Sequence, residues 1–142
     1  MAYYQSRQQG EIVPISSGST GAGTAPSMPP YGVSILTGTS SEVYVLQAPT
    51  IPGQRKTIMF AGNSTANNPV VRLSTATGVV SFYNGATTGL TIMTCAAARS
   101  TASCQVVDLV SINTTSWAIT NVFPCTTTPT AANLGGGITL SS

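Results

Sequence analysis

The chain has 142 residues, of which 42% are hydrophobic and only 6% are charged, with a formal net charge of +2. This length suits a single domain with a real core, and five scattered cations argue against nucleic-acid binding, which needs clustered lysine and arginine. No apolar run approaches the ~20 residues that cross a bilayer, so we expect neither a nucleic acid nor a membrane as partner.

Residues 1–31 differ in composition from the rest of the chain. The first residues, MAYYQSRQQGE, lack the apolar region of a signal peptide, so we expect synthesis in the cytoplasm. The run GEIVPIS (10–16) is compatible with one short strand, which Pro14 restricts to a sheet edge or an arm. The run SSGSTGAGTAPSMPP (16–30) has almost no side chain able to join a core and is typical of a linker.

We therefore expect residues 1–31 to form an extended N-terminal arm and linker. One interpretation is a passive tail. The other is an arm that lies on a neighbouring subunit, with Tyr3, Tyr4 and Arg7 at its tip, because tyrosine and arginine are enriched in interfaces.

After Tyr31 the pattern changes to short apolar runs separated by turn signals such as Pro52-Gly53 and Asn84-Gly85. No segment shows a sustained helical period. We expect an all-β domain over residues 32–125, a single sandwich or barrel of about eight short antiparallel strands. The expected strands cover 32–37, 42–48, 56–61, 69–74, 79–83, 89–95, 104–112 and 117–123.

Alternation along these strands predicts which side chains face the core. The expected inward residues are Val33, Ile35, Val43, Val45, Ile58, Phe60, Val71, Leu73, Val80, Phe82, Leu90 and Ile92. The strand 104–112 is apolar on both faces, which predicts that both are covered, either inside a sandwich or by another subunit.

The stretch 105–123 predicts two strands joined by the polar turn 113–116, and it carries the single tryptophan. Trp117, Ile119 and Phe123 fall on one face of the second strand, so we expect the centre of the core there. The Gly/Thr-rich C-terminal tail, 126–142, ends in a possible closing strand at 138–140.

The three cysteines, Cys95, Cys104 and Cys125, form no CxxC pair. Buried, reduced thiols are the expectation for a protein that folds in the cytoplasm. A hairpin around AAARSTAS would bring Cys95 and Cys104 together, so a later bridge between them stays open.

The residue types offer little chemistry. There is no histidine, and the three acids, Glu11, Glu42 and Asp108, lie in separate parts of the chain. We therefore predict no catalytic residue, cofactor or metal site. Asp108, within VVDLV, is either a buried acid that accepts hydrogen bonds from hydroxyls or an arginine, or a charge that points across a subunit boundary towards Arg72 or Arg99 of a neighbour.

The segments PGQRKTIMFAGNS (52–64), VVSFYNGAT (79–87) and QVVDLVSINTTSWAITNV (105–122) resemble small virion proteins of tailed bacteriophages. The similarity is greatest to head decoration (cement) proteins, and it covers roughly residues 32–123. The resemblance implies a structural, non-enzymatic protein on the capsid surface of the virion. Its implied partners are the major capsid protein and sister subunits. The resemblance also implies trimers at three-fold positions of the capsid lattice, so a homotrimer is the expected oligomer.

Two other classes stay open. One is a tail, fibre or head-spike module of a phage virion, and the other is a carbohydrate-binding module or an enzyme of the same β class. As candidate interface residues we take Tyr3, Tyr4 and Arg7 in the arm, together with Arg55 and Lys56 at the start of a strand.

Overall fold

The computed structural model describes residues 12–15, 25–37, 41–61, 69–74, 81–83, 89–95, 105–123, 133–135 and 138–141. These residues form strands and short connections, with no helix among them, so the all-β prediction is confirmed. The strands are β1 (Ile12–Ile15), β2 (Ser27–Met28), β3 (Gly32–Leu36), β4 (Val43–Leu46), β5 (Arg55–Phe60), β6 (Val70–Leu73), β7 (Ser81–Tyr83), β8 (Ile92–Cys95), β9 (Gln105–Asn113), β10 (Ser116–Phe123), β11 (Asn133–Gly135) and β12 (Ile138–Ser141). No helix of the described residues is long and apolar enough to cross a membrane.

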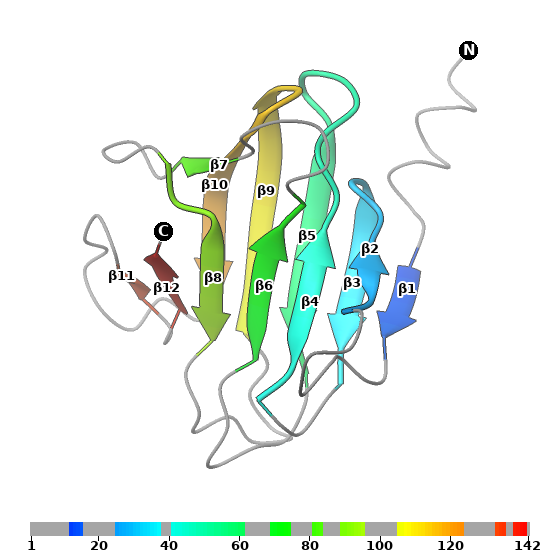
Figure 1. Ribbon diagram of the computed structural model, residues 1–142, viewed down its shortest axis with the longest axis vertical. Coiled ribbons are helices and arrows are strands. Elements are labelled where there is room, and N and C mark those ends of the chain that lie inside the picture. Colours follow the sequence, from blue (N-terminus) through cyan, green and yellow to red (C-terminus); the bar gives the residue numbers. More distant parts are fainter. Residues whose placement is uncertain are drawn as a thin grey trace.

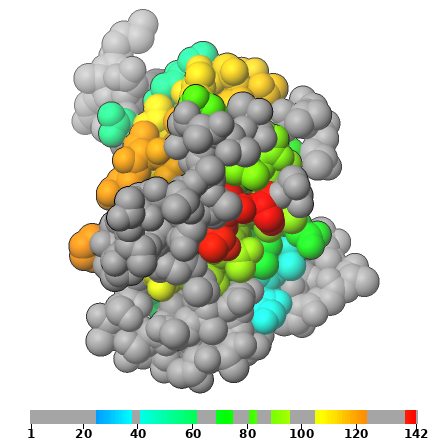
Figure 2. Space-filling view, turned by 90° about the vertical axis from the view of Figure 1, so that its left-hand side faces the viewer, coloured from blue at the N-terminus to red at the C-terminus, as the bar shows by residue number. Residues whose placement is uncertain are grey.

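The strands form two six-stranded sheets, which we call sheet A and sheet B (Figure 1). Sheet A has the order β1-β3-β5-β9-β10-β7, and sheet B the order β11-β12-β8-β6-β4-β2. Figure 1 shows sheet B in front of sheet A, with β1 and β2 at one side of the molecule and β11 and β12 at the other. Figure 2 looks onto that second side, where β12 lies beside residues of β8, its partner in the sheet.

Consecutive strands from β1 to β9 alternate between the two sheets. From β1 to β6, successive strands of the same sheet run in the same direction, which gives the four parallel pairs β1–β3, β2–β4, β3–β5 and β4–β6. With β7–β10, five of the ten strand pairs in the described part are parallel, and the other five, β6–β8 among them, are antiparallel. The expectation of about eight antiparallel strands was wrong, since twelve strands form mixed sheets.

The core lies between the sheets and takes side chains from both. Sheet A contributes Leu36, Ile58, Phe60, Phe82, Val107, Leu109 and Trp117. Sheet B contributes Met28, Tyr44, Leu46, Val71, Leu73, Met93, Cys95, Ile138 and Leu140. Trp117 is fully buried, as the sequence predicted.

Several predicted inward faces are wrong. In β3 the buried residues are Ser34 and Leu36, and Val33 and Ile35 point outward. In β4 Tyr44 and Leu46 are buried, while Val43 and Val45 are only partly so. The physical reason is that both faces of these strands carry apolar residues, so alternation alone does not say which set the core takes. Ile92 is also only partly buried, whereas Leu90 packs against the core as expected. Val80 lies outside the described residues.

Phe123 is 63% exposed, although it was expected beside Trp117 and Ile119. The register of β10 against β9 shifts between Ile119 and Asn121. Such a bulge adds one residue and reverses the alternation beyond it. As a result Val122 packs against the core instead and Phe123 faces outward.

The described part of residues 1–31 belongs to the two sheets. β1 pairs with β3 at the edge of sheet A, where Pro14 is tolerated. β2 pairs with β4, and Met28 is fully buried in the core. Met28 is thus a core side chain within the run 16–30, of which residues 16–24 lie outside the described part. A single long, flexible thioether is enough to fill a gap between strands. The closing strand expected at 138–140 lies within β12.

Candidate functional site on the outer face of sheet A

The outer face of sheet A carries mostly apolar side chains. They alternate with the buried ones along β3, β5, β9 and β10. Among them Ile112 is 49% exposed and Phe123 is 63% exposed. The apolar residues that point outward in the described part of this face are Val33, Ile35, Met59, Val106, Val110, Ile112, Ala118 and Phe123.

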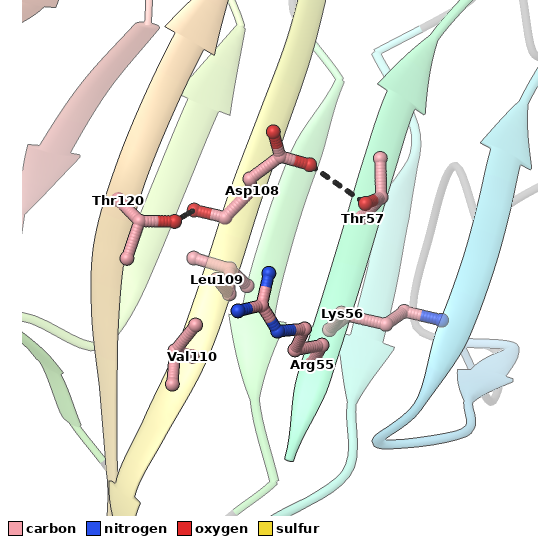
Figure 3. A pocket seen from close by; sticks show the side chains of 7 residues that line it. All are labelled: Arg55, Lys56, Thr57, Asp108, Leu109, Val110 and Thr120. Carbon is pink, nitrogen blue, oxygen red and sulfur yellow. Dashed lines mark hydrogen bonds between the residues drawn. The ribbon is translucent and has the colours of Figure 1, made fainter. Parts of the chain in front are cut away.

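A shallow depression of about 170 Å³ lies on this face (Figure 3). It spans the neighbouring strands β5, β9 and β10. The residues that line it are Arg55, Lys56, Thr57, Asp108, Leu109, Val110 and Thr120. Polar groups therefore gather at the centre of an otherwise apolar face.

Asp108 is the polar centre of the depression. Thr57 Oγ1 donates to Asp108 Oδ1 at 2.7 Å, and Asn121 Nδ2 donates to Asp108 Oδ2 at 3.2 Å. Thr120 Oγ1 donates to the Asp108 backbone carbonyl at 3.1 Å. The bulge in β10 sets both Thr120 and Asn121 against Asp108, because two residues there oppose one.

Asp108 shows features of both interpretations, a buried acid that accepts hydrogen bonds and a charge that points outward. The carboxylate accepts a hydrogen bond from a hydroxyl, as the first reading expected. The side chain is only partly buried, and it makes no ion pair with the described residues. Arg72 lies exposed on β6 of sheet B, so it is no partner for Asp108 within the chain. Arg99 lies outside the described residues.

Arg55 opens β5 and is exposed at the lip of the same depression. No hydrogen bond or ion pair joins its guanidinium to any described residue. Figure 3 shows the guanidinium on the same face as Val110, which lies opposite Arg55 in the sheet, with the Asp108 carboxylate farther along β9. Of the candidate interface residues, Arg55 is the one that the structure places on an open face.

Lys56 is only 1% exposed, which corrects its assignment to an interface. Neighbouring residues of a strand point to opposite sides, so an outward Arg55 requires an inward Lys56. Its ammonium donates to Ser34 Oγ at 2.6 Å and to the Tyr31 backbone carbonyl at 3.1 Å. Tyr3, Tyr4 and Arg7 lie outside the described residues.

The acids of the described part do not form a carboxylate pair. Glu42 is buried and accepts a hydrogen bond of 2.5 Å from the Tyr44 hydroxyl, whose ring is in the core. Asp108 lies on the outer side of sheet A. No three His, Cys, Asp or Glu residues of the described ranges are grouped as metal ligands are.

Cys95 is buried, and its Sγ donates to Gln105 Oε1 at 2.9 Å. Cys104 and Cys125 lie outside the described residues, so the bridge between Cys95 and Cys104 stays a hypothesis.

Sequence reasoning singled out Asp108 but not the groups that bind its carboxylate. Thr57 lies 51 residues away along the chain and Asn121 lies beyond a bulge. The VVDLV pattern shows that the acid is unusual, but only the pairing of β5 with β9 and the register shift in β10 reveal its partners.

Comparison with known proteins adds no relative. No protein-family model matches the chain, and no curated protein is significantly similar in sequence.

Proposed function

We propose that this protein is a structural subunit of a phage virion that binds the outer surface of the assembled capsid and reinforces it through contacts between subunits. The segments that resemble decoration proteins motivate the virion setting. The outer surfaces of the two sheets motivate the structural role. In this proposal the protein has no catalytic residue and no cofactor, and it acts only through the surfaces that it covers.

The observation that carries the proposal is the outer face of sheet A. Its only charged side chains in the described strands are Arg55 and Asp108, and Phe123 and Ile112 are largely exposed. Charged residues are depleted and aromatic residues enriched at the centres of protein interfaces. A contiguous apolar face on a soluble chain usually marks a binding surface, so this face is best explained as one that a partner covers.

Sheet B offers a second face that is also poor in charge. Its outward residues in the described strands include Val43, Val45, Val70 and Ile92, with Arg72 as the charged one. A subunit with two such faces can contact the capsid with one and a sister subunit with the other. We also infer that the two sheets act as a single sandwich, since their buried faces share one core.

The test is binding of the purified protein to heads that lack it. We expect saturable co-sedimentation that persists at about 1 M salt, where charges are screened beyond ~3 Å, because the contact is mainly apolar. Phe123→Asp and Ile112→Asp should reduce binding if sheet A provides the contact. Arg72→Ser is the matched change on sheet B. Absence of co-sedimentation for the wild-type protein would refute the decoration role.

Location separates this role from the second class. Antibody labelling of the native particle in electron micrographs should mark the head. Label confined to the tail or its fibres would identify a tail, fibre or spike module. Binding of the isolated protein to a glycan array, without attachment to particles, would favour a carbohydrate-binding module.

A further inference from the structure

The depression on sheet A holds two charges of opposite sign that do not pair with each other. Arg55 and Asp108 both line it. No ion pair joins either side chain to any described residue. Each is the single charge of its sign that points outward from the described strands of this sheet, since Lys56 is turned into the core.

The sheet register places the two charges diagonally on neighbouring strands. Arg55 lies opposite Val110, and Asp108 lies opposite Thr57. The two Cα atoms are thus one strand apart, about 4.8 Å, and displaced by two residues, about 7 Å, along the strand. Thr57 and Asn121 hold the carboxylate in place by one hydrogen bond to each oxygen. Each carboxylate oxygen retains a further acceptor site for a donor that approaches from outside.

We propose that this face binds a second copy of the chain, face to face about a two-fold axis, so that each Arg55 contacts the partner's Asp108. A two-fold contact uses the same patch on both subunits and must be complementary to itself. A patch with one cation and one anion side by side meets this condition. A two-fold axis that passes between the two charges places the cation of each subunit opposite the anion of its partner. Two equivalent ion pairs then form at the centre of the contact.

The surroundings of the two charges suit such a contact. Met59, Val106, Val110, Ile112 and Phe123 lie around the depression on the same face. Apolar residues around a polar centre exclude water, which strengthens the central ion pairs. The β1 edge of sheet A is a poorer alternative, because Pro14 has no N–H to donate to an added strand.

This inference deepens the proposed function by naming the sister-subunit face, and it predicts a two-fold dimer in place of the trimer that the resemblance implies. The two can fail separately. A protein that is monomeric in solution but still binds heads would overturn the dimer alone. A dimer that does not bind heads would overturn only the decoration role.

The experiment is a charge exchange, read by sedimentation equilibrium of the full chain without heads. We expect the wild-type protein to form dimers. Arg55→Asp places an aspartate against the partner's Asp108, and Asp108→Arg places an arginine against the partner's Arg55. Like charges in direct contact cost several factors of ten in affinity, so each single variant should raise the dimer dissociation constant about 100-fold. Arg72→Asp, on the outer face of sheet B, should leave it unchanged.

Recovery of the contact is the decisive result. Equimolar Arg55→Asp and Asp108→Arg chains should form a mixed dimer with an affinity within about tenfold of the wild type, because both contacts again join opposite charges. Trp117 fluorescence reports whether each variant is folded. Arg55 is exposed, so Arg55→Asp alone suffices if Asp108→Arg does not fold. A wild-type monomer, a trimer that Arg55→Asp does not affect, or a dimer unchanged by Arg55→Asp would each overturn the proposal.

Discussion

The hairpin β9–β10 and the region β1–β6 differ in how their strands pair. We call β1–β6 the coiled region, because the chain alternates between the two sheets along it. The hairpin joins the two longest strands, of nine and eight residues, through a short turn. Asn113 Oδ1 accepts hydrogen bonds from Thr115 N at 2.7 Å and Thr115 Oγ1 at 2.9 Å, which fixes that turn locally. In β1–β6 each strand has at most six residues. Two neighbouring strands of one sheet in this region are separated along the chain by a strand of the other sheet.

This difference has a physical consequence. The hairpin pairs residues that are near in sequence, so closing it costs little loop entropy. Each parallel pair of the coiled region closes only after the chain has crossed to the other sheet and back. Pairing of strands that are distant in sequence is slow, and the burial of side chains must compensate the entropy lost in closing the loop between them. The coiled region therefore depends on its inward side chains more than on local pairing.

The two regions also bury different side chains. The coiled region encloses the polar residues Ser34, Glu42, Gln54 and Lys56, and the hairpin encloses Ser111 and the Trp117 ring. Buried polar groups are costly unless they are paired. The Gln54 backbone N–H donates to Ser111 Oγ at 2.8 Å, and the Ser111 backbone N–H donates to the Gln54 carbonyl at 2.9 Å. The polar groups thus help to fix how the coiled region is set against the hairpin.

The largest effect is expected in the hairpin, at Trp117. Trp117→Ala should lower the free energy of unfolding by about 3–5 kcal/mol, the range for removing a buried large aromatic. Trp117 is fully buried. Urea denaturation followed by circular dichroism measures the loss. Phe123→Ala, on the same strand but 63% exposed, is the control and should change stability by less than about 0.5 kcal/mol. Equal losses at both positions would contradict the bulge that turns Phe123 outward.

The next effect tests whether the start of the coiled region belongs to the fold. Met28→Ala should cost about 2–4 kcal/mol, because Met28 is fully buried although β2 has only two residues. The neighbouring Ser27 is exposed, and Ser27→Ala should be neutral within about 0.5 kcal/mol. Thermal unfolding of both variants decides the matter. If Met28→Ala were also neutral, residues 16–31 would act as a separate linker after all.

The strand-forming segments and some buried residues could be predicted from the sequence, whereas the pairing of strands in the sheets could not. The β-rich segments, the burial of Trp117 and the edge position of the strand with Pro14 follow from residue type and alternation. Alternation gives two possible faces for β3 and β4, and both carry apolar side chains, so the choice of Leu36 over Ile35 needed the packed structure. The parallel pairs follow from the crossing of the chain between sheets, which no local pattern encodes.

The same limit applies to the candidate site. Asp108 was recognised as unusual, and Arg55, one of the interface candidates, is exposed at the depression. Lys56 is buried instead, since two adjacent cations on one strand point to opposite sides and the sequence does not show which one is buried. Thr57 and Asn121 became partners of Asp108 only through non-local register.

A smaller effect should come from the polar interior of the coiled region. Ser34→Ala removes the acceptor that lies 2.6 Å from the buried Lys56 ammonium. Hydrogen bonds to charged groups contribute about 1.5–3 kcal/mol, so we expect a loss in that range by urea denaturation. Ser141→Ala, at an exposed position of β12, is the matched control. A loss no greater than that of the control would mean that Lys56 finds an equal partner without Ser34.

The smallest effect is expected on the outer face, at Thr57. Thr57→Val keeps the branched shape and removes the hydroxyl that donates to Asp108. The bond joins a charged acceptor, but it lies on a partly exposed face where water competes, so the loss should be only about 0.5–1.5 kcal/mol. Asp108→Asn and the double variant complete a cycle, and if the bond exists the two single losses should sum to more than the double loss. The substitution should also affect association, because an Asp108 carboxylate without the Thr57 hydroxyl is less firmly placed for Arg55 of a second copy. Thr57→Val should therefore weaken the dimer by less than Arg55→Asp does, and additive losses in the cycle would show that Thr57 does not hold Asp108.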